Sequence, residues 1–174
     1  MRKVLGEEFF KRKTTTVAKE LLGKFLVRKV GNKEIALMIT ETEAYDGPPD
    51  LGSHSAKGRT ERTEVLFGPP GVWYVYLIYG LHHLVNVTTA RAGAAVLIRG
   101  VERYPKPGIL TKALAITRDL NKKSQAKKSG LWIEDRGVKI PKSNIVAGPR
   151  IGIAYAKEWA DKPWRFVISK DSLK

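Results

Sequence analysis

Two glutamates separated by a single residue end a stretch in which apolar side chains alternate. Glu41 and Glu43 follow Ile35, Leu37 and Ile39, so strand geometry predicts that all five side chains share one face. A carboxylate at the margin of an apolar core is partly desolvated, which raises its pKa and suits it to general-base chemistry. A salt-bridged strand end is the alternative explanation of the same spacing.

An aromatic segment, Trp73–Tyr79, could provide stacking surfaces. Alternation places Tyr74 and Tyr76 on one face, while Tyr79 lies at a turn before Gly80. Tyrosine rings beside a basic surface are what stacking on nucleic-acid bases requires, because every base offers a π-face. A tyrosine-rich core strand whose hydroxyls reach the surface is the alternative, and the segment on its own favours it.

Few residue types in this chain could hold a metal or form a covalent intermediate. There is no cysteine, and the three histidines, His54, His82 and His83, lack partners at metal-binding spacing. We therefore expect no metal and no other cofactor. His54 lies in a polar segment, where it could donate a hydrogen bond in a pocket or face water. A nucleophilic lysine would need a buried site, and no spacing nominates one.

The net charge points to an anionic partner. Among 174 residues, 32 are lysine or arginine and 17 are aspartate or glutamate, which gives a formal charge of +15. In a small protein with this charge the basic side chains repel one another unless an anion binds to them. Nucleic acid is the commonest such partner. An anionic membrane surface would instead require the basic residues to be concentrated on one amphipathic helix, whereas here they are spread along the chain.

The composition also bounds the class of protein. The hydrophobic content of 43% supplies a core and excludes disorder throughout the chain. No apolar run approaches the ~18 residues of a membrane span, and the first residues turn polar too soon for a signal peptide. We expect a cytoplasmic, intracellular protein that associates with DNA and not with membranes.

The elements that must position these residues suggest an α+β domain covering residues 1–174. No repeat or linker divides the chain, and strands do not alternate regularly with helices, which favours an antiparallel sheet. Helices are predicted at 7–22 and 110–116. Strands are predicted at 24–30, 34–43, 72–79, 84–89, 95–101, 150–155 and 165–168.

Several segments, in the same order along the chain, resemble the alkyladenine (3-methyladenine) DNA glycosylase family of monofunctional base-excision repair enzymes. A single motif of this kind would be weak, but the ordered set is specific. The segments are Glu41–Tyr45, His54–Ser55, Pro70–Gly80, Asn86–Val87, Val96–Arg99, Thr111–Ile116, Arg150–Ile153, Glu158–Ala160 and Lys162–Phe166.

The resemblance implies a compact single domain with a curved antiparallel β-sheet, surrounding helices and a protruding β-hairpin that enters the DNA minor groove. The expected substrate is double-stranded DNA that contains damaged purines, and we expect the enzyme to act as a monomer. By the same resemblance, Glu43 is the general base that activates water. Arg99 and the main-chain carbonyl near Ile151 would help to hold that water.

The resemblance also assigns a base pocket. Tyr45 and Tyr76 would sandwich the extruded base, His54 would stack and hydrogen-bond beside them, and Asn86 would crowd the exocyclic amine of guanine. Tyr79 would be the wedge that fills the gap left in the duplex, because a damaged base must be extruded before it can be reached.

Three basic residues after His54 are candidates to hold DNA phosphates, namely Lys57, Arg59 and Arg62; a solvated loop would explain them equally well. Nearby, Glu61 and Thr63 stand where the family commonly has proline and asparagine. The run Lys106–Leu110 also departs from the usual Gly-Pro-Gly-Lys-Leu, with Ile109 in place of the lysine. We expect these departures to affect DNA contacts and substrate range, and not Glu43.

Two other functions are open from the sequence. A non-catalytic nucleic-acid-binding module would use the charge and the tyrosines but would leave Glu43 and Arg99 without a role. A bifunctional glycosylase/lyase would need a lysine nucleophile. Release of free base, and borohydride trapping of a covalent adduct, separate the three possibilities.

Overall fold

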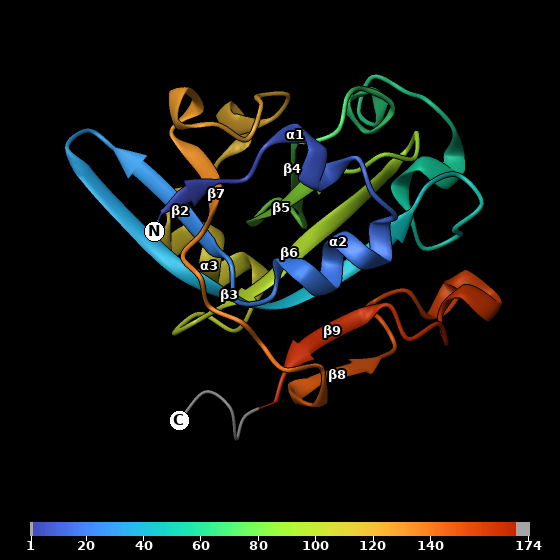
Figure 1. Cartoon of the computed structure of the whole chain (residues 1–174). Helices are drawn as coiled ribbons and strands as arrows, with labels where there is room; N and C mark the ends of the chain where they lie inside the picture. Colours follow the sequence, from blue (N-terminus) through green and yellow to red (C-terminus); the bar gives the residue numbers. More distant parts are fainter. Residues whose placement is uncertain (1, 170–174) are drawn as a thin grey trace.

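One open antiparallel sheet forms the frame of the protein. The computed structural model describes residues 2–169 (Figure 1). In this part of the chain the main path of the sheet runs β1 (Lys3–Val4), β7 (Leu131–Asp135), β2 (Phe25–Val30), β3 (Lys33–Asp46), β6 (Ala94–Val101), β5 (His82–Thr88) and β4 (Trp73–Ile78). A side branch pairs β9 (Arg165–Ile168) with β3, and β8 (Ile145–Gly148) with β9.

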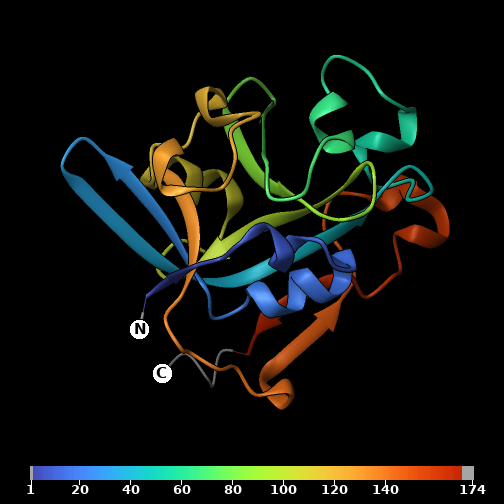
Figure 2. The same cartoon turned by 45° about the horizontal axis from the view of Figure 1, so that its top comes forward.

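Short helices complete the α+β architecture. Helices α1 (Glu7–Phe10) and α2 (Thr14–Leu21) lie across the sheet in both views (Figures 1 and 2), and α3 (Pro107–Ala113) packs on β5 and β6. The described residues also form 3₁₀ helices at His54–Lys57, Glu64–Phe67, Arg118–Leu120, Lys127–Ser129, Lys142–Asn144 and Ala154–Trp159. The predicted α+β class with an antiparallel sheet is confirmed. Met1 and residues 170–174, at the ends of the predicted domain, lie outside the described residues.

The two faces of the sheet differ. The main core includes Val17 and Leu21 of α2 together with Val85, Val96 and Ile98 of the central strands, so it lies on the side of the sheet that α2 covers. A much smaller apolar cluster consists of Val65, Leu66, Tyr74 and Ala95. Because Ala95 alternates with Val96 along β6, this second cluster occupies the opposite face. The cavity described below lies on that face.

An irregularity in the pairing of β3 with β6 reverses the expected face of the two glutamates. The register shifts between Ile39 and Glu41 and again between Glu41 and Thr42. Before the irregularity Ile39 lies in the main core, and after it Thr42 donates to the carbonyl of Ala18 in α2. Glu41 and Glu43 therefore lie opposite the core, and the prediction that they share a face with Ile35, Leu37 and Ile39 is wrong. A β-bulge re-aims side chains in this way.

The predicted helix at 7–22 is interrupted. It forms as α1 and α2, with a break at residues 11–13. Threonine suits the beginning of a helix better than its interior, and the buried Thr14 hydroxyl bonds Asp46 at the end of β3 and Thr89. Because of the break, α2 begins at Thr14, where these hydrogen bonds hold its first turn against the end of β3. The second predicted helix is present as α3 but begins at Pro107, because proline fits the first helical position.

The predicted strand at 150–155 is also wrong. Residues 150–153 form an irregular segment and Ala154 begins a 3₁₀ helix. The polar groups of Arg150 and the N–H of Ile151 bond to buried side chains and carbonyls instead of to a neighbouring strand. No strand was predicted at β1, β7 or β8.

The β4–β5 hairpin ends in a tight turn that exposes a tyrosine. Tyr79 and Gly80 have φ angles of 51° and 66°, and the N–H of Leu81 donates to the carbonyl of Ile78. Two positive φ values are what a type I′ hairpin turn requires. A side chain in the left-handed region costs roughly 1–2 kcal/mol. The Tyr79 side chain is 87% exposed, so it gains little from packing in return.

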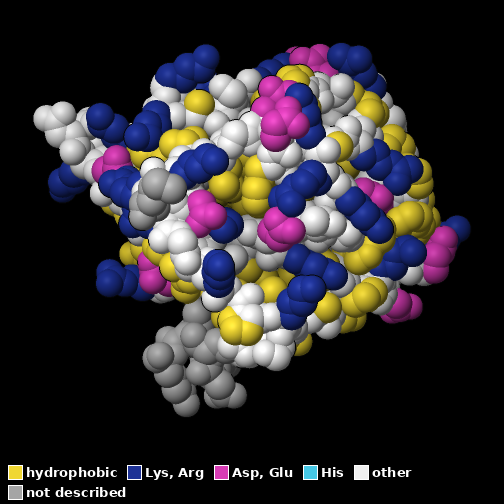
Figure 3. All heavy atoms as spheres, in the orientation of Figure 1, with side chains coloured by type: hydrophobic (Ala, Val, Ile, Leu, Met, Phe, Trp, Pro, Cys, Tyr) yellow, Lys and Arg dark blue, Asp and Glu magenta, His cyan; other side chains and the backbone are white. Residues whose placement is uncertain are grey.

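Basic side chains are spread over the surface and are not gathered in one patch on the face seen in Figure 3. On the face seen in Figure 3, lysine and arginine side chains are interspersed with acidic ones and do not gather on one element. None of the helices within residues 2–169 is both long and apolar enough to cross a membrane.

Candidate active site

A cavity of about 470 Å³ lies on the face of the sheet opposite the main core. It is bounded by strands β3 to β6, by the 3₁₀ helix at His54–Lys57 and by the irregular segment after Arg150. The structure brings nine of the predicted site residues to this cavity. These residues are Glu43, Tyr45, His54, Arg62, Tyr76, Tyr79, Asn86, Arg99 and Ile151.

Glu43 is fully buried at the cavity and accepts two strong hydrogen bonds. Its Oε2 accepts from the Tyr45 hydroxyl at 2.7 Å, and its Oε1 accepts from the main-chain N–H of Ile151 at 2.9 Å. Nε of Arg99 lies 3.6 Å from Oε1. The carboxylate is thus fixed in orientation by two neutral donors, with one cation close by.

Burial raises the pKa of Glu43 above its ordinary value. Loss of solvent is the largest effect, and the nearby Glu41 charge acts in the same direction. The Ile151 N–H, the Tyr45 hydroxyl and Arg99 favour the ionised form and oppose the rise. A carboxylate with a raised pKa and an accessible cavity beside it has the properties of a general base.

Glu41 has a different environment. Its Oε1 accepts from Nε of Arg99 at 3.0 Å and from Nη1 of Arg165 at 3.1 Å. Two guanidinium groups therefore donate hydrogen bonds to Glu41, whereas both hydrogen bonds to Glu43 come from neutral donors and Arg99 forms only a longer ion pair of 3.6 Å with it. The two carboxylates of the Glu-Thr-Glu motif are suited to different roles, with Glu41 holding Arg99 in place beside Glu43.

An aromatic wall faces Glu43 across the cavity. The rings of Tyr74 and Tyr76 lie 5.1 Å apart, which agrees with the predicted shared face on β4. His54 packs edge-on against Tyr76 at 4.6 Å, and its Nδ1 is 2.9 Å from the Tyr74 hydroxyl. The guanidinium of Arg62 lies 5.4 Å from the centre of the Tyr76 ring. These contacts hold flat surfaces in fixed positions.

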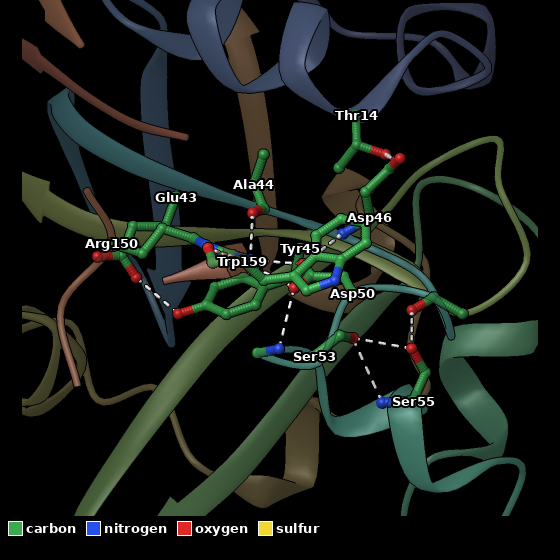
Figure 4. Close-up of polar contacts among 12 residues, drawn as sticks. Thr14, Glu43, Ala44, Tyr45, Asp46, Asp50, Ser53, Ser55, Arg150 and Trp159 are labelled. Atoms are coloured by element: carbon green, nitrogen blue, oxygen red, sulfur yellow. Dashed lines mark hydrogen bonds and ion pairs between the residues drawn. The ribbon is translucent and has the colours of Figure 1, made fainter. Parts of the chain in front are cut away.

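His54 is kept neutral by its surroundings. Burial lowers the pKa of His54 from 6.5 to about 4, and the charges of Arg62 and Lys57 contribute in the same direction. Hydrogen bonds of two serine side chains hold the 3₁₀ helix that carries His54. The Ser53 and Ser55 hydroxyls lie 2.8 Å apart, and Ser55 donates to the carbonyl of Gly93 (Figure 4).

Asn86 lines the cavity from β5 and is itself buried. Its side-chain amide donates to the carbonyl of Tyr74 on β4 at 3.2 Å, and the residue is 4% exposed. The cross-strand bond fixes the orientation of the amide. A base that enters the cavity would meet a rigid polar group here.

The predicted phosphate-holding residues separate into two groups. Arg62 lines the cavity, whereas Lys57 and Arg59 are exposed outside it. Tyr79 at the hairpin tip also lines the cavity. The hairpin tip and Arg62 therefore contribute to the same cavity.

A buried ion pair behind Tyr45 was not predicted from the sequence. Arg150 and Asp50 are bonded through two contacts of 2.5 Å and 2.8 Å, and both side chains are inaccessible to solvent. The Arg150 guanidinium also lies 4.7 Å from the centre of the Tyr45 ring (Figure 4). The only signal in the sequence is the presence of the two residues, which are 100 positions apart.

Cofactor chemistry has no evident ligand set in the described residues. No three histidine, cysteine, aspartate or glutamate side chains within residues 2–169 group as a metal site would need. Asp50, the most buried aspartate near the cavity, has both oxygens bonded to Arg150 and to the N–H groups of Asp46 and Gly52.

Comparison with known proteins shows the family of this chain. A family model described as methylpurine-DNA glycosylase matches residues 8–106 and 103–172. A protein of Myxococcus xanthus named "Putative 3-methyladenine DNA glycosylase" is 48% identical over 175 residues, covering 94% of this chain and 89% of the relative. A Legionella pneumophila protein (strain Lens) with the same name is 46% identical over 177 residues, covering 97% and 95%.

The family model and these relatives show that the protein is a DNA glycosylase, a hydrolase that acts on the N-glycosidic bond. The chain belongs to the methylpurine-DNA glycosylase family.

Proposed function

We propose that this protein excises alkylated or deaminated purines from duplex DNA by hydrolysis with a water molecule that Glu43 activates. The expected substrates are 3-methyladenine, 7-methylguanine, hypoxanthine and ethenoadenine. The observation that carries the proposal is the fully buried Glu43, which has a raised pKa, lies beside a cavity and faces an aromatic wall. The enzyme acts as a monomer in this proposal.

Base extrusion comes first. A base within the duplex cannot reach a buried carboxylate, so the nucleotide must leave the stack at a cost of a few kcal/mol. Tyr79 enters the duplex from the hairpin tip and replaces part of the lost stacking. Lys57, Arg59 and Arg62 hold phosphates around the opening and contribute affinity that does not depend on sequence.

The pocket then selects the base. Tyr45 and Tyr76 bind its two faces, and His54 stacks and hydrogen-bonds at the edge as a neutral imidazole. A cationic lesion such as 3-methyladenine is attracted to electron-rich rings as other cations are. Asn86 crowds the exocyclic amine that distinguishes guanine, because its own bond to Tyr74 prevents it from moving aside.

Hydrolysis completes the cycle. Glu43 takes a proton from the water that attacks the sugar, while Arg99 and the main-chain carbonyl of Ile151 hold that water in line. The negative charge of Glu43 also stabilises positive charge that develops on the sugar. Cationic bases leave without protonation, whereas a neutral base such as hypoxanthine needs a proton from a general acid as its bond to the sugar breaks. Glu41 keeps Arg99 beside Glu43 and is not itself the base.

The lining of the cavity supports hydrolysis by water over a lyase mechanism. The side chains that line the cavity within the described residues include no lysine, so no amine is present to form a Schiff base there. A binding module without catalysis would not need a buried carboxylate, which costs stability.

The experiment is a base-release assay on duplexes that each carry one lesion. Release of free damaged base, with no covalent adduct trapped by borohydride, is the expected result. Binding without release would favour a nucleic-acid-binding module, and a trapped adduct would favour a lyase.

A further inference from the structure

A single buried guanidinium touches both elements that supply the hydrogen bonds to Glu43. Nη1 of Arg150 donates to the carbonyl of Ala44 at 2.9 Å, and Ala44 lies between Glu43 and Tyr45 in β3. The same guanidinium covers the Tyr45 ring at 4.7 Å. Arg150 is also the residue directly before Ile151, whose N–H bonds Glu43. Both donors to the carboxylate therefore depend on where Arg150 is held.

Asp50 fixes Arg150 in that place. Its two carboxylate oxygens bind both Nη atoms and also accept the N–H groups of Asp46 and Gly52. Nη2 makes a further bond to the carbonyl of Trp159. A lysine could not reproduce this arrangement, because a bidentate pair requires the planar fork of arginine. The pair thus ties β3, the segment after β3 and the segment around Ile151 together (Figure 4).

The packing leaves the pair almost no freedom. A Cβ atom at Gly52 would lie 2.8 Å from Cδ1 of Ile153 and 3.1 Å from Nη2 of Arg150, so a larger residue would press on both side chains. Nε of Arg150 is buried without an acceptor among the described residues.

Arg150 does not itself line the cavity, whereas Tyr45 and Ile151 do. It lies behind the ring of Tyr45 as seen from the cavity, where it cannot touch the base or the attacking water. Any effect on the reaction must therefore pass through the two residues that it holds.

We propose that the Arg150–Asp50 pair positions the Ile151 N–H and the Tyr45 hydroxyl on Glu43 and thereby sets the pH at which the enzyme gains its general base. Arg150 and Asp50 are positioning residues in this proposal, which rests on the proposed function of Glu43. Weakening either hydrogen bond would leave the carboxylate less compensated, so that it would ionise only at higher pH.

Other ionisable groups also face Glu43 and remain unchanged in the test. They are Glu41 on β3, Arg99 on β6, Tyr76 on β4 and, through Glu41, Arg165 on β9. Since none of them contacts Asp50 or Arg150 in the bonds described above, a change at the pair that moves the ionisation of Glu43 reports on the positioning of its donors.

The test is the acid limb of the single-turnover excision rate against pH, measured on a duplex with 7-methylguanine. This cationic base leaves without protonation, so the rise of the rate with pH reports the base alone. The main variant combines Arg150→Met with Asp50→Asn, which leaves no unpaired buried charge and keeps an acceptor for a loop N–H. We expect the acid limb to move up by about one pH unit, as for loss of one hydrogen bond to a charged group.

Arg150→Lys is the second variant, and it keeps a cation against Asp50 so that the chain still folds. It loses the fork, and we expect a smaller shift in the same direction. The control is Arg136→Met with Glu134→Gln, which removes another ion pair with a buried carboxylate, on β7 and away from the cavity. This control is expected to lower the melting temperature and leave the acid limb in place.

An unmoved acid limb in the Arg150 variants would overturn the proposal, and the pair would then be structural only. Glu43→Gln separates this failure from failure of the proposed function. If Glu43→Gln retains the wild-type rate and pH profile, the proposed function fails. If Glu43→Gln abolishes excision while the Arg150 variants keep the wild-type limb, only the positioning role fails.

Discussion

The main-chain N–H of Ile151 donates to Oε1 of Glu43 at 2.9 Å, although the two residues are 108 positions apart. This bond joins the central strand β3 to an irregular segment near the end of the chain. It holds one oxygen of a buried carboxylate while the Tyr45 hydroxyl holds the other. The proposed general base is therefore assembled by long-range contacts, and several predictions depend on its burial.

Glu43→Gln is expected to raise the melting temperature at pH 7. Because the folded state raises the pKa of Glu43, the group's favourable contribution to stability is present at low pH and is lost as pH rises through the folded pKa. Glutamine removes the charge at every pH. The advantage of the variant should shrink as pH is lowered toward 4.5, the ordinary value for glutamate. Thermal denaturation at several pH values measures it, and a variant less stable at pH 7 would contradict it.

His54 should remain neutral down to a pH of about 4, which NMR of the imidazole ring can follow. The unfolded chain binds a proton at His54 near pH 6.5, whereas the folded chain does not. Stability therefore falls as pH drops from 6.5 toward 4. His54→Gln should lose less stability than wild type over this interval. Equal losses in the two proteins would show that His54 does not contribute.

Tyr79→Ala should weaken binding to a duplex with an abasic site by the value of one stacking interaction, ~1–3 kcal/mol. The fold should tolerate the change, because the side chain is 87% exposed. Tyr79→Phe keeps the ring and is the matched control, with binding close to wild type. If Tyr79→Ala binds and excises as wild type does, Tyr79 is not the wedge.

Duplex binding should depend strongly on salt and weakly on sequence, because phosphate contacts supply the affinity. Arg59→Gln and Lys57→Gln should each reduce the slope of log affinity against log salt by about one. Lys33→Gln, at the exposed β2–β3 turn away from the cavity, should leave the slope unchanged. Affinity that stays flat between low and moderate salt would contradict the account.

The alternation of side chains along β4 predicted the aromatic part of the site, because the strand pairs with β5 without a register shift. Tyr74 and Tyr76 share a face as expected, and Tyr79 occupies the exposed turn. The face of Glu41 and Glu43 was predicted wrongly, since period-two reasoning cannot detect a register shift that depends on the partner strand. The resemblance to a family, and not this pattern, is what predicts Glu43 as the base, and that assignment stays a prediction.

The supporting residues could not be predicted from spacing. Asp50 and Arg150 lie in irregular segments far apart in the chain, and only the folded sheet brings them together behind Tyr45. The same long-range bonding explains why 150–155 is not a strand: its polar groups bond to buried partners outside any ladder. Pattern methods detect regular elements, and this part of the site is built without them.

The most direct test of the account is single-turnover excision of 7-methylguanine by purified, folded Glu43→Gln. Glutamine has nearly the same size but cannot take a proton from water. The account predicts a rate lower by roughly 10²–10⁴, the range for loss of general-base catalysis, with binding to lesion DNA retained or tightened. Excision within a few-fold of the wild-type rate would contradict it, and Glu41 would then become the candidate base.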